Sequence, residues 1–316
     1  MRVVFMGTPD FAVETVNAIA EAGHEIVLVV TQPDKPKGRG KEIQFPPVKE
    51  WAAERNIPVF QPVKIRDTEA IETLKKYDAD IFVVAAFGQI LPKEILDMPP
   101  LGCVNVHASL LPKYRGAAPI QWAVINGDKV SGVTTMMMGV GLDDGDMLLK
   151  QEVVLSEDET GGSLFDRLAE VGGELIVRTM EGLAAGTITP VPQVEAEATH
   201  VGMIKKSFGQ LDFALEAIVL ERRIRGLNPW PSAYTKLGNK TLKVWWARVE
   251  SALPDTASGD ITEPGAICHA DETGIWVATG KDYLVLEEIQ LEGKKRMSTA
   301  DFLRGRNLEI GTKLGG

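Results

Sequence analysis

Cysteine and histidine are scarce in this sequence, and their scarcity excludes several kinds of site. The two cysteines, Cys103 and Cys268, lie too far apart for a disulfide framework or for the close pairs of a zinc site. The four histidines have no metal-ligand spacing, and the chain contains no G-x-S-x-G, Walker lysine or H-E-x-x-H motif. We therefore expect structural thiols and no metal.

Long hydrophobic runs are also missing from the start of the chain. The opening residues "MRVVFMGTPDF" contain a short apolar stretch that ends at Gly7, too short for a signal peptide or a membrane span. We expect a cytoplasmic protein, a monomer, with no membrane partner.

Basic residues are outnumbered by acidic ones, 34 against 44, which gives a formal net charge of −10. A net negative charge argues against sequence-blind binding of polyanions. Residues 206–316 carry as many basic as acidic side chains, so the whole excess lies in residues 1–205. An RNA partner would therefore have to be recognised by local basic features.

Alternating strand and helix patterns predict an α/β domain in the first half of the chain. Residues 3–5 predict a buried strand, and Thr8 is expected to cap a helix that begins at Pro9 and ends at Gly23. The opening turn "GTPDFA" lacks the later glycines of a dinucleotide-binding fingerprint, which argues against NAD. Further strands are expected at 25–30, 79–87 and 102–106, with a helix near 67–76. This alternation is typical of a Rossmann-like, mostly parallel wound sheet.

The pattern changes after residue 130. "VTTMMM" and "DMLLKQEVVL" predict an antiparallel strand pair around a Gly/Asp loop, and residues 160–184 predict a helix. A helix at about 212–226 then precedes many short apolar runs separated by turn residues, which favour a small OB-like β-barrel. We expect a catalytic domain at 1–188, a proline-containing linker at 189–206 and a β-barrel domain at 207–316.

Three polar side chains stand out as candidates for chemistry. Asn105 and His107 lie two residues apart at the end of an expected strand, so they project to the same side. An amide can donate to a developing oxyanion, and an imidazole can donate or accept a proton. Asp143 lies in the glycine-rich stretch "GVGLDDGDM", whose backbone can approach another segment closely, and a carboxylate beside His107 would favour the imidazolium.

Each of these features also has a structural interpretation. A lone histidine at a strand end is often a structural residue, and the Gly/Asp stretch can be a polar turn between strands. A calcium loop starting at Asp143 would need glutamate at its twelfth position, where the chain has Val154.

A basic, proline-rich stretch occupies residues 32–47, "QPDKPKGRGKEIQFPP". We expect its four prolines and two glycines to prevent regular structure. The composition alone leaves open a solvated, disordered insertion or an RNA-binding loop. The basic residues in question are Lys35, Lys37, Arg39 and Lys41.

The stretches "NVHASLLPKYRGAAPIQW" and "GVGLDDGDM" together closely resemble the folate-dependent formyltransferases. "FMGTPDFA", "TQPDKPKGRGKE" and "RIRGLNPWPSAY" extend the resemblance over both halves of the chain, to members that formylate methionine on charged initiator tRNA. The resemblance implies 10-formyltetrahydrofolate as the formyl donor and no metal. One departure is Asp144, which stands where many relatives have Thr.

The resemblance also implies roles for particular residues. Asn105, His107 and Asp143 would be the catalytic residues, and the basic stretch would contact the tRNA. The segment "SLLP" would bind the folate, with Leu110 and Leu111 as apolar walls, although both leucines can also be plain core residues. The folate-binding residues implied are Ser109, Leu110, Leu111 and Pro112.

Two rival functions remain open. A formyltransferase that acts on an amino-sugar nucleotide would share "HASLLPKYRG" but would not be expected to have this basic stretch and C-terminal half. A non-catalytic RNA-binding module would not bind folate.

Overall fold

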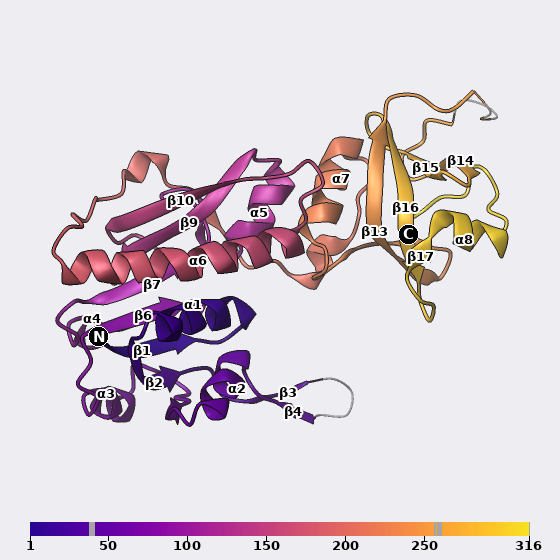
Figure 1. The fold of residues 1–316 in the computed structure, drawn as a ribbon. Helices are drawn as coiled ribbons and strands as arrows, with labels where there is room; N and C mark the ends of the chain where they lie inside the picture. Colours follow the sequence, from indigo (N-terminus) through magenta and orange to yellow (C-terminus); the bar gives the residue numbers. More distant parts are fainter. Residues whose placement is uncertain (38–41, 256, 258–260, 316) are drawn as a thin grey trace. The chain divides into compact units, whose positions relative to one another are not determined.

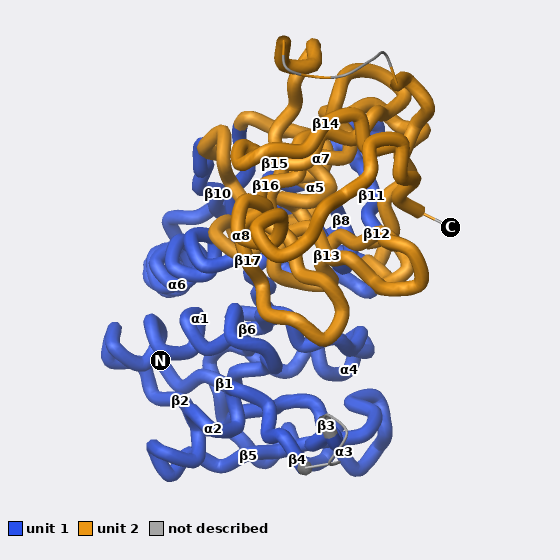
Figure 2. The backbone as a smooth tube through the Cα atoms, turned by 90° about the vertical axis from the view of Figure 1, so that its right-hand side faces the viewer, with its two compact units in different colours: residues 1–119, 130–154, 165–201 blue, residues 120–129, 155–164, 202–316 orange. Residues whose placement is uncertain are grey.

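The computed structural model of the protein describes residues 1–37, 42–255, 257 and 261–315. The chain forms two compact units (Figure 2). The first unit comprises residues 1–119, 130–154 and 165–201, and the second comprises residues 120–129, 155–164 and 202–316.

A seven-stranded sheet forms the centre of the first unit (Figure 1). The strand order is β10-β9-β7-β6-β1-β2-β5, in which β7, β6, β1, β2 and β5 are parallel and β9 and β10 are antiparallel. The predicted wound, mostly parallel sheet and the antiparallel pair after residue 130 are therefore confirmed. The strands are β1 (Arg2–Gly7), β2 (Glu25–Val30), β5 (Val59–Phe60), β6 (Ile81–Ala85), β7 (Cys103–His107), β9 (Val130–Met137) and β10 (Met147–Val154).

Helices cover both faces of this sheet. On one face α1 (Asp10–Glu21) packs against α6 (Gly161–Ala184): the Phe11 and Phe165 rings meet edge to face at 5.7 Å, and a Cβ at Gly173 would lie 3.1 Å from the Glu14 carbonyl. The other face buries its side chains under α3 and α4. The remaining helices up to residue 126 are α2 (Pro47–Glu54), α3 (Thr68–Leu74), α4 (Lys93–Leu96) and α5 (Pro119–Asn126). Among the described residues no helix is both long and apolar enough to cross a bilayer.

The start of α1 differs from the prediction. The helix begins at Asp10, and Pro9 is its N-cap residue without a side-chain hydrogen bond. The Thr8 hydroxyl instead donates to the Phe87 carbonyl and accepts the Gln32 N–H, at 3.5 and 3.4 Å. Thr8 therefore ties the first turn to two neighbouring segments rather than capping the helix.

The basic stretch contains regular structure, contrary to the prediction. β3 (Lys35–Lys37) pairs antiparallel with β4 (Glu42–Gln44), and Pro36 faces Ile43. A strand of a two-stranded ribbon leaves alternate N–H groups without a ladder partner, so a proline at such a position removes no bond. Arg39 and Lys41 lie outside the described residues.

Residues 191–201 pair with segments of the first unit. Val191 exchanges two 2.8 Å backbone hydrogen bonds with Met147, and β11 (His200–Val201) pairs parallel with β8 (Arg115–Gly116). A short 3₁₀ helix, η1 (Glu195–Glu197), lies between these contacts. The expected linker at 189–206 is thus divided between the units after Val201.

An antiparallel sheet forms the second unit, as predicted. Its order is β12-β13-β16-β15-β14, with β17 paired to β16. α7 begins at Ala217, later than expected, because the Asp212 carboxylate accepts the Ala214 N–H at 3.0 Å and turns the chain. The elements are β12 (Ala233–Leu237), β13 (Lys240–Glu250), β14 (Ile267–Asp271), β15 (Gly274–Ala278), β16 (Tyr283–Leu291), β17 (Met297–Ser298), η2 (Lys206–Gly209), α7 (Ala217–Gly226) and α8 (Thr299–Arg304).

The two edges of this sheet are joined by residues 311–315. On the β14 side, the Leu314 N–H donates to the Gly265 carbonyl at 2.7 Å and the Ile267 N–H donates to the Thr312 carbonyl at 2.8 Å. On the β12 side, the Gly315 N–H donates to the Lys236 carbonyl at 3.0 Å. The segment therefore closes the sheet and satisfies backbone groups that an open edge would expose.

Both cysteines are free and buried. Burial raises the pKa of the Cys103 thiol to about 12, and it also raises the pKa of Cys268. Neither thiol is positioned to act as a nucleophile at neutral pH, which agrees with the expected structural role.

Replacing Leu314 tests the closure of the barrel. Leu314 is 3% exposed within the core of the second unit, so Leu314→Ala should lower the free energy of unfolding by about 2–5 kcal/mol. Ile310, 43% exposed, is the matched control, and Ile310→Ala should change stability by about 0.5 kcal/mol or less. Urea unfolding followed by tryptophan fluorescence measures both. Equal, small effects of the two substitutions would contradict closure by this segment.

Candidate active site

Strand β7 places Asn105 and His107 in the interior of the first unit. The strand is buried along its whole length between β6 and β9, with Asn105 opposite Val84 and Met136 and His107 opposite Thr134. The two residues are 8% and 6% exposed. No described residue hydrogen-bonds the Asn105 carboxamide, so its N–H groups remain available to a ligand.

Both ring nitrogens of His107 face defined partners. Nε2–H donates to the Tyr114 carbonyl at 2.9 Å, and because a carbonyl only accepts, this nitrogen carries a proton. Nδ1 faces Asp143 Oδ2 at 3.7 Å, longer than a hydrogen bond but within ion-pair range. Nδ1 is therefore the nitrogen left to exchange a proton or to bind a developing negative charge.

Asp143 lies in the loop between β9 and β10. Its side chain is 14% exposed, and Oδ2 accepts the Gly116 N–H at 2.8 Å. The loop also contains Gly145, where a Cβ would come within 1.8 Å of the Met137 carbonyl oxygen, so this close approach of two backbone segments requires glycine. Of the expected catalytic residues, the structure brings His107 and Asp143 into contact, and Asn105 projects from the same strand as His107.

The Asp143 loop approaches His107 from an unexpected direction. Met137, the last residue of β9, is opposite Val104, and the Met138 N–H donates to the Cys103 carbonyl at 2.8 Å. The chain thus leaves the sheet three residues before His107, or roughly 10 Å along the strand. The loop has to fold back along β7 to bring the carboxylate to the imidazole.

Residues 109–112 form a turn whose backbone is held by β9 and β10. The Thr134 hydroxyl donates to the Ser109 carbonyl at 2.7 Å and accepts the Leu111 N–H at 3.1 Å. The Lys150 ammonium donates to the Leu111 carbonyl, and burial lowers the pKa of Lys150 while Glu197 opposes the shift.

The side chains of this turn divide into two groups. Leu111 is 1% exposed and is a core residue, and Ser109 is equally buried, with its hydroxyl donating to the Lys113 carbonyl at 2.7 Å. Pro112 is buried as well. Leu110 is partly exposed and packs towards Gly132. Of the two leucines, only Leu110 offers an accessible apolar surface.

Thr134, Lys150 and Gln193 contact the site but were missed by the sequence analysis. Thr134 is fully buried in β9. A polar residue in a buried strand can indicate a hydrogen bond to a neighbouring segment, so the sequence does contain a signal for Thr134. No pattern in the sequence marks Lys150 or Gln193. Lys35 of the basic stretch is exposed on β3, and Lys37 belongs to the same strand.

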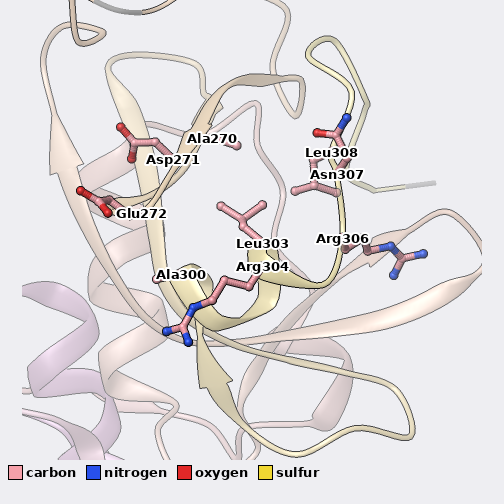
Figure 3. A pocket seen from close by; sticks show the side chains of 9 residues that line it. All are labelled: Ala270, Asp271, Glu272, Ala300, Leu303, Arg304, Arg306, Asn307 and Leu308. Carbon is pink, nitrogen blue, oxygen red and sulfur yellow. The ribbon is translucent and has the colours of Figure 1, made fainter.

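In the described part of the chain, no group of histidine, cysteine and carboxylate side chains is arranged to hold a metal ion. A cavity of about 350 Å³ lies in the second unit, with Asp271 and Glu272 on one side and Arg306 on the other (Figure 3). It contains none of the residues implicated above. Its other lining residues are Ala270, Ala300, Leu303, Arg304, Asn307 and Leu308.

A wound sheet that brings a carboxamide and an imidazole of one strand to a carboxylate of a neighbouring loop has the groups that acyl transfer requires. The formyl transferase family model matches residues 1–180, and the model of the formyl transferase C-terminal domain matches residues 203–307. The chain belongs to the formyl transferase family.

Curated relatives match the whole chain. A protein of Agathobacter rectalis named methionyl-tRNA formyltransferase is 60% identical over 312 residues, covering 99% of both chains. A protein of Lachnospira eligens with the same name is 56% identical and covers 100% of both chains.

Solved structures share the fold at low identity. WlaRD, a sugar 3N-formyl transferase described in the presence of dTDP and 5-N-formyl-THF, has a TM-score of 0.64 and 15% identity, covering 93% of this chain and 99% of its own. HypX from Aquifex aeolicus, described in complex with tetrahydrofolic acid, has a TM-score of 0.59 and 15% identity, covering 96% of this chain and 47% of its own.

Replacing Thr134 tests how the 109–112 turn is held. Thr134→Val keeps the side-chain shape but removes the partner of the Leu111 N–H and the Ser109 carbonyl, so unfolding should become easier by about 1–3 kcal/mol. Thr134→Ser keeps the hydroxyl and serves as the control. Urea unfolding should rank the variants wild type, Ser, Val in falling stability. If Ser were as destabilised as Val, the hydroxyl would not be the important group.

Proposed function

We propose that the protein transfers a formyl group from 10-formyltetrahydrofolate to the α-amino group of methionine on charged initiator tRNA. The observation that carries the proposal is the pairing of His107 Nδ1 with Asp143 Oδ2, next to Asn105 on the same strand. Full-length relatives named methionyl-tRNA formyltransferase support this acceptor over an amino-sugar nucleotide. The sugar formyltransferases that share the fold are only 14–21% identical.

Each member of the catalytic group has a distinct role in this reaction. The neutral amine attacks the formyl carbon, and negative charge develops on the formyl oxygen. Asn105 and protonated His107 donate to that oxygen, and each well-placed donor is worth about 3 kcal/mol. Asp143 favours the charged imidazole and accepts the amine proton through water, while the departing N10 of tetrahydrofolate takes up a proton.

Folate binding is assigned to the turn of Ser109, Leu110, Leu111 and Pro112. The partly exposed Leu110 supplies an apolar contact for the pterin, and the carbonyl groups of the turn, each able to accept a second hydrogen bond, bind its polar edge. Thr134 and Lys150 support the assignment by fixing that backbone. Folate carries the one-carbon unit itself, so no metal is required.

Binding of tRNA is assigned to the basic stretch and to the second unit. Lys35, Lys37, Arg39 and Lys41 would contact phosphates or bases. Exposed Ile43 and Phe45 on and beside β4 add apolar surface to this ribbon. The proposal includes catalysis by the first unit and tRNA binding by the second, in a cytoplasmic monomer.

Formylation of charged initiator tRNA is the direct test of the function. The purified protein should produce N-formylmethionyl-tRNA only with the folate donor present. It should give no product with an amino-sugar nucleotide as acceptor. Formylation of the sugar instead, or no folate binding, would overturn the proposal.

The role of Asp143 is tested by Asp143→Asn. The amide can still accept the Gly116 N–H, but it cannot stabilise a charged imidazole or take a proton, so kcat should fall about 100-fold or more. Asp144→Asn, one residue along the loop, is the matched control and should keep nearly normal turnover. Near-normal kcat for Asp143→Asn would remove Asp143 from the mechanism.

The role of the basic stretch is tested by Lys35→Ala and Arg39→Ala. Removing a phosphate contact should raise KM for tRNA about 3- to 10-fold, reduce its salt dependence and leave KM for the folate donor unchanged. Lys64, an exposed lysine outside the stretch, is the control. An unchanged kcat/KM for tRNA in both variants would exclude this stretch as a tRNA contact.

A further inference from the structure

Residues 191–201 connect the two loops that flank the candidate catalytic group. Val191 pairs with Met147 at the start of β10, directly after the Asp143 loop. Further on, Val201 is opposite Gly116, and the Tyr114 N–H donates to Thr199 Oγ1 at 2.8 Å (β8 and β11 in Figure 2). The segment therefore contacts both the Asp143 loop and the turn that holds His107 Nε2.

Gln193 makes the central contacts of this segment. Its Nε2 donates to the Asp143 carbonyl and to the Gly145 carbonyl, each at 2.8 Å. Its Oε1 accepts a hydrogen bond from Arg115 Nε at 2.9 Å. Two carbonyl acceptors require the NH₂ end and an arginine donor requires the oxygen end, so only one orientation of the amide satisfies all three contacts.

Arg115 fixes Gln193 in turn. Arg115 is 3% exposed, and it also donates from Nη1 to Glu195 Oε2 at 2.9 Å. The Glu195 side chain is 78% exposed, so this ion pair is solvent-screened and contributes less than the buried contact to Gln193. Arg115 thus orients the Gln193 amide through Nε and binds the Glu195 carboxylate through Nη1.

The main chain at Asp143 is held by hydrogen bonds from another segment. Its φ is +52°, in the left-handed region that non-glycine residues rarely adopt. Gln193 binds the carbonyl of this same residue and that of Gly145, while the carboxylate is anchored at the other end by the Gly116 N–H. The backbone and the side chain of Asp143 are therefore fixed from two directions.

We infer that Gln193 is a positioning residue of the reaction: by binding the Asp143 and Gly145 carbonyls, it holds the folded-back loop so that the carboxylate faces His107. The inference rests on the proposed catalytic role of Asp143. Gln193 touches none of the reacting groups and acts through Asp143. Displacement of a catalytic group by about 1 Å is enough to cost about 100-fold in rate.

Gln193→Met is the first test, because methionine has a similar length and can make none of these hydrogen bonds. It should lower kcat about 10- to 100-fold and leave KM for both substrates within about twofold. Gln193→Glu, which puts oxygen against both carbonyls, should have the same effect. Glu195→Gln is the control in the same segment and should keep normal kcat. Normal kcat in the two Gln193 variants would overturn the inference.

A double-mutant cycle separates positioning from a general structural role. If Gln193 acts through Asp143, Gln193→Met should change the rate of the Asp143→Asn enzyme by about twofold or less. Multiplicative losses in the double variant would show an effect independent of Asp143 and would overturn the inference. Normal turnover of Asp143→Asn alone would instead refute the proposed catalytic assignment. Thermal unfolding of every variant identifies losses of activity that come from misfolding. If Gln193→Met misfolds, the cycle is run with Gln193→Glu in its place.

Discussion

The β9–β10 loop has to fold back along β7 to bring a carboxylate to His107, and the organisation of the site follows from this requirement. The loop leaves the sheet beside Cys103, and hydrogen bonding to β7 ends there. Its return depends on contacts from elsewhere: the Gly116 N–H on the Asp143 side chain and the Gln193 amide on its backbone. The close approach of the loop to the Met137 carbonyl requires glycine at 145. The pair of His107 and Asp143 is therefore a product of tertiary contacts and not of strand geometry.

The sequence predicted those features that depend on local pattern. Buried apolar runs alternating with helices gave the wound sheet, and a two-residue spacing placed Asn105 and His107 on one side of β7. Contacts between distant segments were not predictable in the same way. Thr134 and Lys150 reach the 109–112 turn from 23 to 39 residues away, and Gln193 reaches Asp143 from 50 residues away. Such contacts depend on strand register and on the paths of loops, which the hydrophobic periodicity of the sequence does not reveal.

Two local predictions failed for identifiable physical reasons. The prolines and glycines of residues 32–47 predict no regular structure, but Pro36 lies in a two-stranded ribbon, which has positions where a missing N–H costs nothing. Threonine is a residue type that often caps helices, but the Thr8 hydroxyl hydrogen-bonds the Phe87 carbonyl and the Gln32 N–H instead. In both cases a residue preference was correct on average and was outweighed by the particular neighbours that the fold supplies.

The attachment of residues 191–201 to the first unit has a practical consequence for modular exchange. Chimaeras between related enzymes are usually joined in the stretch that looks most like a tether, here the prolines around residue 190. With a junction there, Gln193, Thr199 and Val201 would come from the parent enzyme that supplies the C-terminal half. The reaction centre would then combine residues of two different parent enzymes. A crossover after Val201, where the chain passes into the second unit, keeps these residues with the Asp143 loop that they contact.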